Sequence, residues 1–170
     1  MRQIILAIAL LFSVSAFAAE RHADPELEAL LPKTLGGVVL IIESQSGADL
    51  AARGAAFEGF LNALGKTRAD FAVASAYARS GLKAAMSAWR VRGAAGSDLL
   101  AAFKTAMQAS SATALTTGEE KFAGRDITRI GGPDELAQGP LYVILRGDVL
   151  LFVQTPERAL AEEAVGKFPR

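Results

Sequence analysis

Hydrophobic and polar positions fall into short blocks along this chain, and several blocks have the period of a strand. Three blocks are apolar at every position except Tyr142: Val38–Ile42, Leu141–Leu145 and Val149–Val153. Runs of this length that are rich in β-branched residues predict strands that are buried on both faces. These three segments are therefore the expected centre of a sheet.

Turn residues divide the other strand-like segments into hairpins. Larger residues alternate with alanine in Phe71–Tyr77, and a partner strand is expected over Ala85–Arg92. Further hairpins are predicted with turns at Ala123-Gly124 and at Gly147-Asp148. Glycine and aspartate are favoured in such turns because they tolerate a positive φ.

Helical segments are indicated where apolar residues recur three and four positions apart. A short helix should start at Asp24-Pro25-Glu26, where an aspartate precedes a proline. Three longer helices have the apolar stripes Phe57, Phe60, Leu61 and Leu64; then Leu99, Leu100, Phe103 and Met107; then Leu160, Ala164, Val165 and Phe168. Ser97 is the expected cap of the second, and an Arg158/Glu162 pair should lie on the outer face of the third.

The order of these elements predicts an α+β sandwich, in which a largely antiparallel sheet of about seven strands has three main helices packed on it. Strands that are apolar on both faces need cover on both faces. If the helices cover one face, the other face needs a second layer of sheet, a partner subunit or an apolar ligand. The pattern leaves these three possibilities open.

The amino-terminal end has the three parts of a secretory signal peptide. Arg2 supplies the positive charge, an unbroken apolar run follows, and Ala16-Phe17-Ala18 is a small-residue cleavage site. The apolar stretch ends at Ala19 and is shorter than the roughly 18 to 20 residues that span a bilayer. We therefore expect residues 1–18 to be removed and residues 19–170 to form a single exported α+β domain, periplasmic or extracellular, with no membrane span.

Composition narrows the classes of chemistry and of partner. The chain has no cysteine, so disulfides, thiol nucleophiles and thiolate metal ligands are excluded. The 18 basic and 18 acidic residues balance, which gives no reason to expect a nucleic acid as partner. Folding must depend on the packing of one apolar core.

Two short motifs are explained by local structure rather than by a ligand. Gly65-Lys66-Thr67 resembles the end of a phosphate-binding loop, but Phe60 stands where that loop needs its first glycine. Arg146-Gly147-Asp148 is the tripeptide of integrin-binding loops, but a tight hairpin between two apolar strands favours glycine and aspartate at its centre, so we interpret it as a turn. The sequence thus indicates no cofactor.

His22, the only histidine, limits both metal binding and catalysis. A histidine that is third from a free amino terminus can bind copper or nickel, but cleavage after Ala18 puts His22 fourth, and only a chain that starts at Glu20 puts it third. A serine–histidine–acid triad would have to recruit this same tail residue. A carboxylate pair remains available from Glu119/Glu120, Glu162/Glu163 and Asp126.

The candidate ligand- or partner-binding residues are Arg90, Arg92, Tyr77 and Tyr142. Arg90 and Arg92 alternate with apolar residues, so both guanidinium groups should lie on one sheet face, where they would bind an anion or form a solvated surface. Tyr77 and Tyr142 are the only tyrosines. Their positions on predicted strands make them the accompanying candidates.

The leading hypothesis is a non-catalytic exported module that binds a protein partner or an apolar small molecule. It depends on the surplus of apolar strand and on the missing catalytic residue types. The alternatives are an envelope hydrolase that uses a carboxylate pair and a structural homodimer whose exposed sheet face is its interface.

Overall fold

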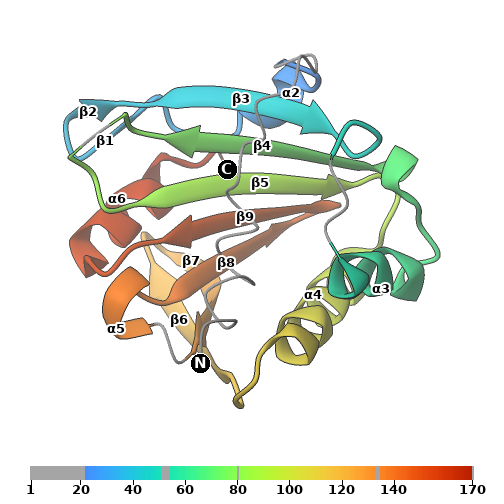
Figure 1. Ribbon diagram of the computed structural model, residues 1–170. Coiled ribbons are helices and arrows are strands. Elements are labelled where there is room, and N and C mark those ends of the chain that lie inside the picture. Colours follow the sequence, from blue (N-terminus) through green and yellow to red (C-terminus); the bar gives the residue numbers. More distant parts are fainter. Residues whose placement is uncertain (1–21, 51–53, 80, 133–134, 170) are drawn as a thin grey trace.

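The computed structural model describes residues 22–50, 54–79, 81–132 and 135–169. Seven strands form one sheet in the order β3-β4-β5-β9-β8-β7-β6, and all neighbours in it are antiparallel (Figure 1). The strands are β3 (Ile41–Ser46), β4 (Phe71–Tyr77), β5 (Ala85–Val91), β6 (Thr116–Phe122), β7 (Arg125–Gly131), β8 (Leu141–Arg146) and β9 (Val149–Gln154). The predicted α+β class and the predicted antiparallel sheet are confirmed. The predicted signal peptide lies outside the described residues.

Three main helices and several short elements accompany the sheet. The main helices are α3 (Ala55–Ala63), α4 (Gly96–Ser110) and α6 (Arg158–Lys167), and the short ones are α2 (Pro25–Glu28), α5 (Glu135–Gln138) and a 3-10 turn at Arg68–Asp70. A separate two-stranded hairpin joins β1 (Thr34–Leu35) to β2 (Val38–Val39). Ser97 lies inside the first turn of α4 rather than at its cap, which is Ala95.

The prediction of one continuous buried strand over Val38–Ile42 is wrong. Gly36 and Gly37 both have positive φ, 55° and 75°, so the chain reverses there and β2 pairs back onto β1. The main-sheet strand β3 begins only at Ile41, and Val39 is 76% exposed. The apolar run is divided between two sheets because glycine permits the turn that precedes it.

Helices cover both faces of the sheet. On one face α3 and α4 pack against a cluster that includes Val73, Trp89, Leu150, Phe152 and Val143. On the other face α2 and α6 pack against a cluster that includes Ala74, Ala88, Leu151, Val153 and Ile144. In Figure 1, α3 and α4 lie side by side at one end of the strands, and α6 lies at the other end.

This arrangement overturns the expectation that helices would cover one face only. The central strands β8 and β9 are buried on both faces by helices of the chain itself, without a second sheet layer, a partner or a ligand. Helical periodicity shows that a helix has an apolar side, but it does not show which face of a sheet that side will cover. The bulk of the apolar strands therefore gives no argument for a bound molecule.

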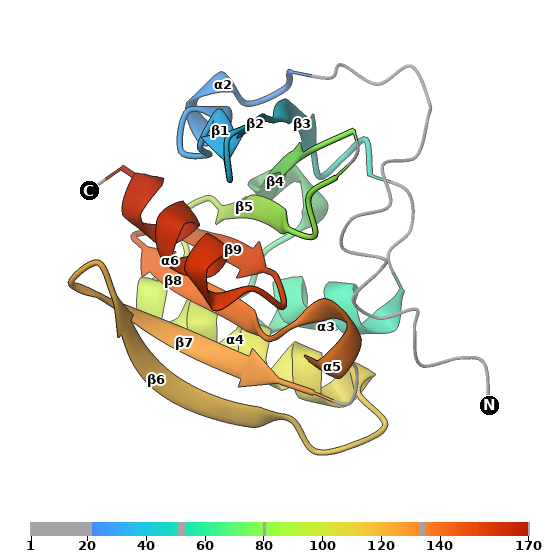
Figure 2. The same cartoon turned by 90° about the vertical axis from the view of Figure 1, so that its left-hand side faces the viewer.

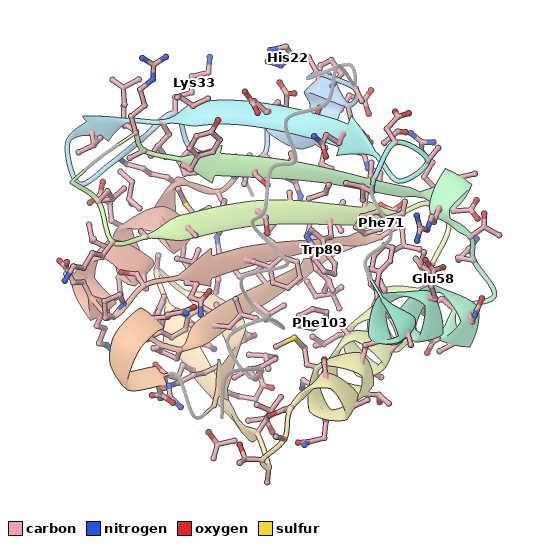
Figure 3. The ribbon with its side chains drawn as sticks, in the orientation of Figure 1. His22, Lys33, Glu58, Phe71, Trp89 and Phe103 are labelled. Atoms are coloured by element: carbon pink, nitrogen blue, oxygen red, sulfur yellow. The ribbon has the colours of Figure 1, made fainter. Side chains whose placement is uncertain are left out.

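An aromatic cluster fills the α3–α4 side of the core. Trp89 lies against the rings of Phe57, Phe60, Phe71, Phe103 and Phe152, with centroid separations of 5.1 to 6.3 Å. Figure 3 shows Phe71, Trp89 and Phe103 on the same side of the sheet. Most of these contacts are edge-to-face, which is the favoured geometry for aromatic pairs. The cluster fixes α3 and α4 to the sheet.

An ion pair fixes the amino-terminal segment on the opposite face. The carboxylate of Asp24 accepts a hydrogen bond from the backbone N–H of Leu27 at 2.9 Å, which confirms the predicted cap. Its other oxygen lies 3.0 Å from Nη1 of Arg90, and the two side chains are only 6% and 18% exposed. Ser44 on β3 adds a hydrogen bond: its Oγ accepts from the backbone N–H of Asp24 at 2.8 Å. The segment is thus tied to β3 and β5 together.

Replacement of Arg90 by methionine should reduce the free energy of unfolding by about 2–4 kcal/mol, because it leaves the Asp24 carboxylate buried without a cation. Urea unfolding followed by far-UV circular dichroism measures this loss. The control is Arg92→Met, an exposed arginine just beyond β5, for which we expect a change within about 0.5 kcal/mol. Equal stabilities of the two variants would contradict the structural role of the ion pair.

Candidate functional site

A hollow of about 590 Å³ lies between the second half of α4 and the adjoining β6–β7 hairpin. It is broadly open to solvent, and its volume is within the range of about 300–1,000 Å³ that is usual for ligand sites. The residues that line it are Lys104, Thr105, Met107, Gln108, Ala109, Leu115, Thr117 and Ile130. Figure 2 shows the β6–β7 hairpin as a long curved ribbon with β6 outermost and α4 nearby.

The hollow exists because α4 continues beyond its last core residue. Phe103 is buried in the aromatic cluster, whereas Met107, one turn later, is only partly buried. The chain then returns from Ser110 to β6 through a loop that the side chain of Gln108 holds in place. Its Nε2 donates to the carbonyl of Thr113 at 3.2 Å, and its Oε1 accepts from the N–H of Leu115 at 2.9 Å.

Most polar side chains that line the hollow have partners within the chain. Besides Gln108, the hydroxyl of Thr105 donates to the carbonyl of Ala101 at 3.1 Å. Nζ of Lys104 lies 3.7 Å from a carboxylate oxygen of Glu119. The apolar lining comes from Met107 and Leu115, which are partly buried, and from Ile130, which is only 4% exposed. The hollow therefore suits an apolar group.

Beside the hollow runs an open strand edge. β6 is the last strand of the sheet and pairs with β7 alone. Thr116, Thr117 and Gly118 are exposed and uncharged, and the charged residues of β6 begin at Glu119. Thr117 is opposite Ile130, so both side chains point to the α4 side of the sheet.

The four candidate residues from the sequence are not brought together into one site. Arg90 is engaged with Asp24, and Arg92 lies exposed beyond the end of β5. Tyr77 is on the sheet face that carries Val73 and the α3–α4 cluster, whereas Tyr142 packs in the cluster of the opposite face. Their role in binding a ligand or partner stays a prediction, and the four side chains do not lie together in the structure.

Tyr142 is the candidate whose surroundings most affect its chemistry. It is 5% exposed and packs on Phe122 with a centroid separation of 5.1 Å. Burial raises the pKa of its phenol, and the nearby carboxylate of Glu120 raises the pKa further. Both effects disfavour the phenolate, so Tyr142 is placed as a neutral core residue.

His22 lies at the start of the described chain, far from the aromatic cluster (Figure 3). Its side chain is 65% exposed, and Nδ1 is 3.0 Å from Oε1 of Glu28. A copper or nickel site at His22 would require a mature chain that begins at Glu20, and Glu20 lies outside the described residues. Within the described part of the chain, no group of three or more His, Asp or Glu side chains could hold a metal ion.

The carboxylates that we considered for catalysis form ion pairs. The pairs are Glu119 with Lys104, Glu120 with Arg158, Glu162 with Arg158, Glu163 with Lys167, and Asp126 with Lys121. Glu119 and Glu120 point to opposite faces of the hairpin, as the strand period requires. The predicted Arg158/Glu162 pair on the outside of α6 is confirmed, with 2.9 Å between Nε and Oε1.

Sequence reasoning missed the hollow, although two signals of it are present in the sequence. Met107 was assigned to the core stripe of α4, but it lies one turn beyond the ring cluster. The stretch between Lys104 and Glu119 contains no charged residue, which is long for the surface of a small protein. Together these features indicate a surface that is apolar and partly open.

Comparisons of the chain with protein-family models, with curated proteins and with solved structures found no match. None of the helices within the described residues is both long enough and apolar enough to span a bilayer. The candidate site therefore stands on the geometry alone.

The ion pair of Glu163 makes the stability depend on pH. Its carboxylate accepts from Nζ of Lys167 at 2.7 Å and from the N–H of Gly36 at 3.1 Å, and both bonds lower its pKa below the ordinary value of about 4.5. A carboxyl whose pKa is lowered by folding adds stability above its unfolded pKa and loses this contribution as the pH falls through the folded pKa. Glu163→Gln should therefore lower the melting temperature at pH 7.

Thermal unfolding of both proteins across a series of pH values measures this effect. The difference between wild type and Glu163→Gln should be largest at neutral pH and should shrink as the pH falls below about 4. A difference that grows on acidification would show that the carboxylate is not stabilised by Lys167 and Gly36.

Proposed function

We propose that this chain is a non-catalytic exported module, and that it binds its partner or an apolar small molecule at the hollow between α4 and the β6–β7 hairpin. The observation that carries the proposal is an open, carbon-lined surface, with Met107, Leu115 and Ile130 in its wall. A concave surface with apolar side chains in its wall is the usual form of a binding site. Export rests on the amino-terminal sequence pattern alone.

The proposal no longer depends on the apolar strands. Their two faces are filled by α3 and α4 on one side and by α2 and α6 on the other. The hollow is different, because the helix that forms one wall of it continues past the core and leaves apolar side chains partly exposed.

The geometry gives less support to a hydrolase. A general acid at neutral pH needs a carboxyl whose pKa is raised. The ion pair with Lys167 instead lowers the pKa of Glu163, and Glu119 and Glu120 lie on opposite faces of the sheet. Each of these side chains is placed to stabilise the surface rather than to exchange protons with a substrate.

The proposal is tested by native mass spectrometry of the protein produced with its own amino-terminal segment and purified gently from the periplasm and from the medium. We expect a mature chain that begins at Ala19 and carries a bound component that is lost on denaturation. In the variant Met107→Lys the component should be absent, because a lysine in the apolar wall loses its hydration when the site is filled.

The matched control is Ala101→Lys, which adds the same charge at an exposed position on α4 outside the hollow. It should retain the component in the wild-type amount. Bare protein in all three samples would contradict the binding function, and a component retained in Met107→Lys would contradict the proposed site.

A further inference from the structure

We infer that the occupant of the hollow is an extended, uncharged peptide segment of a partner protein, which adds to the edge of β6 as a further strand and inserts apolar side chains beside Met107. The inference rests on the proposed function and names the class of ligand. Strand addition to an open sheet edge is a common mode of peptide recognition, in which backbone bonds supply affinity and pockets for alternate side chains supply specificity.

The two edges of the sheet differ in whether another segment lies beside them. β3, at one edge, already has the amino-terminal segment beside it: His22 forms a bridge with Ser44, and the N–H of Ala23 donates to the carbonyl of Ser44 at 3.4 Å. β6, at the other edge, pairs only with β7 among the described strands. Its outer backbone groups can therefore accept an added strand.

The part of β6 beside the hollow carries no charged side chain. Between Lys104 and Glu119 the chain has no charged residue, and these two charges pair with each other at 3.7 Å. Charged side chains on an edge strand normally discourage the addition of another strand, and here they begin only after Gly118. The uncharged part Thr116–Gly118 is the part that adjoins the hollow, so an uncharged segment is the complementary partner.

Side chains on an added strand would alternate between the two faces of the sheet. Thr117 points to the α4 side of the sheet, together with Ile130 opposite it. A residue that pairs with Thr117 on an added strand points to the same side, because directly opposed residues share a face. Its side chain would enter the hollow between Thr117 and Met107. The side chain two positions further along the added strand would point to the same side of the sheet.

The hollow fits a peptide better than it fits a small molecule. Small-molecule sites usually enclose 70–90% of the ligand and orient it with a few unpaired polar groups. This hollow is broadly open, and the side chains of Lys104, Thr105 and Gln108 already have partners. For a peptide the orienting bonds come from the backbone of β6, so free polar side chains are unnecessary.

A second copy of the chain is a poorer occupant. Antiparallel pairing of the full β6 strand with its own copy would centre on Glu119 and bring the two Glu119 side chains opposite each other. Directly opposed like charges destabilise a strand pair.

The probe for the test is a phage-displayed library of random dodecapeptides, selected on the mature protein. We expect enrichment of uncharged sequences in which apolar residues alternate with threonine, serine or other small residues. Synthetic peptides with the enriched sequence are then titrated against wild type, Met107→Lys and Ala101→Lys by fluorescence anisotropy. The Kd should rise about tenfold or more in Met107→Lys and change by less than about twofold in Ala101→Lys.

Two further measurements keep the result interpretable. Circular dichroism verifies that Met107→Lys is folded, and the amide chemical shifts of ¹⁵N-labelled protein locate the peptide. The largest shifts should fall on Thr116–Gly118 and on the second half of α4. If Met107→Lys does not fold, Thr117→Lys replaces it, because Thr117 is exposed and also lines the hollow. The same loss of peptide affinity is expected.

Several outcomes would overturn the inference. One is that the phage selection enriches no sequence. Another is that the peptide binds wild type, Met107→Lys and Ala101→Lys with equal affinity. A third is that the largest amide chemical-shift changes fall at the β3 edge of the sheet. A dimer whose β6 amides are paired, shown by light scattering and chemical shifts, would assign the edge to a second copy. A small apolar component that depends on Met107, without peptide binding, would leave the proposed function intact and refute only the peptide.

Discussion

The structure depends on one constraint, which is that strands apolar on both sides cannot remain in contact with water on either side. β8 and β9 meet this condition over almost their whole length. The chain satisfies it by placing α3 and α4 on one face and α2 and α6 on the other. Burial of apolar surface is the dominant favourable contribution to folding, so the helices are positioned by these strands more than by their own propensity.

The candidate site lies where the helices cease to cover the sheet completely. The aromatic cluster around Trp89 and Phe103 holds α4 against the middle of the sheet. One turn later Met107 still packs on the edge of this cluster but is only partly buried, and the hollow lies there, beside the start of the β6–β7 hairpin. The candidate site is thus at the boundary of the core, where apolar side chains pack against the core but are not fully covered.

Much of this architecture could be predicted from the sequence, because period and turn chemistry are local properties. The hairpins, the three main helices and the approximate number of strands were of this kind. The strand predicted at Val38–Ile42 was wrong, because Gly36 and Gly37 allowed a turn that competed with continuation. Local patterns also could not predict which face of the sheet each helix covers. They could not predict the ion pair of Asp24 with Arg90, because these residues are 66 positions apart along the chain.

The candidate site was harder to predict than the fold for the same physical reason. Met107 continues a helical stripe, and the stripe alone does not show where the opposing surface stops. Arg90 looked available for a ligand because its partner lies in a distant segment. A residue is free for binding only if nothing else in the folded chain engages it, and that is a property of the tertiary structure.

The most direct test of this account is hydrogen–deuterium exchange of the protein at neutral pH, resolved by residue. If the central strands are covered on both faces by the chain itself, amides of β5, β8 and β9 should exchange only through global unfolding. Backbone amides within Thr116–Gly118 that point away from β7 should exchange orders of magnitude faster than the amides of these central strands. Rapid exchange in β9, or strong protection along the whole of β6 in the isolated protein, would contradict the closed core and the open edge.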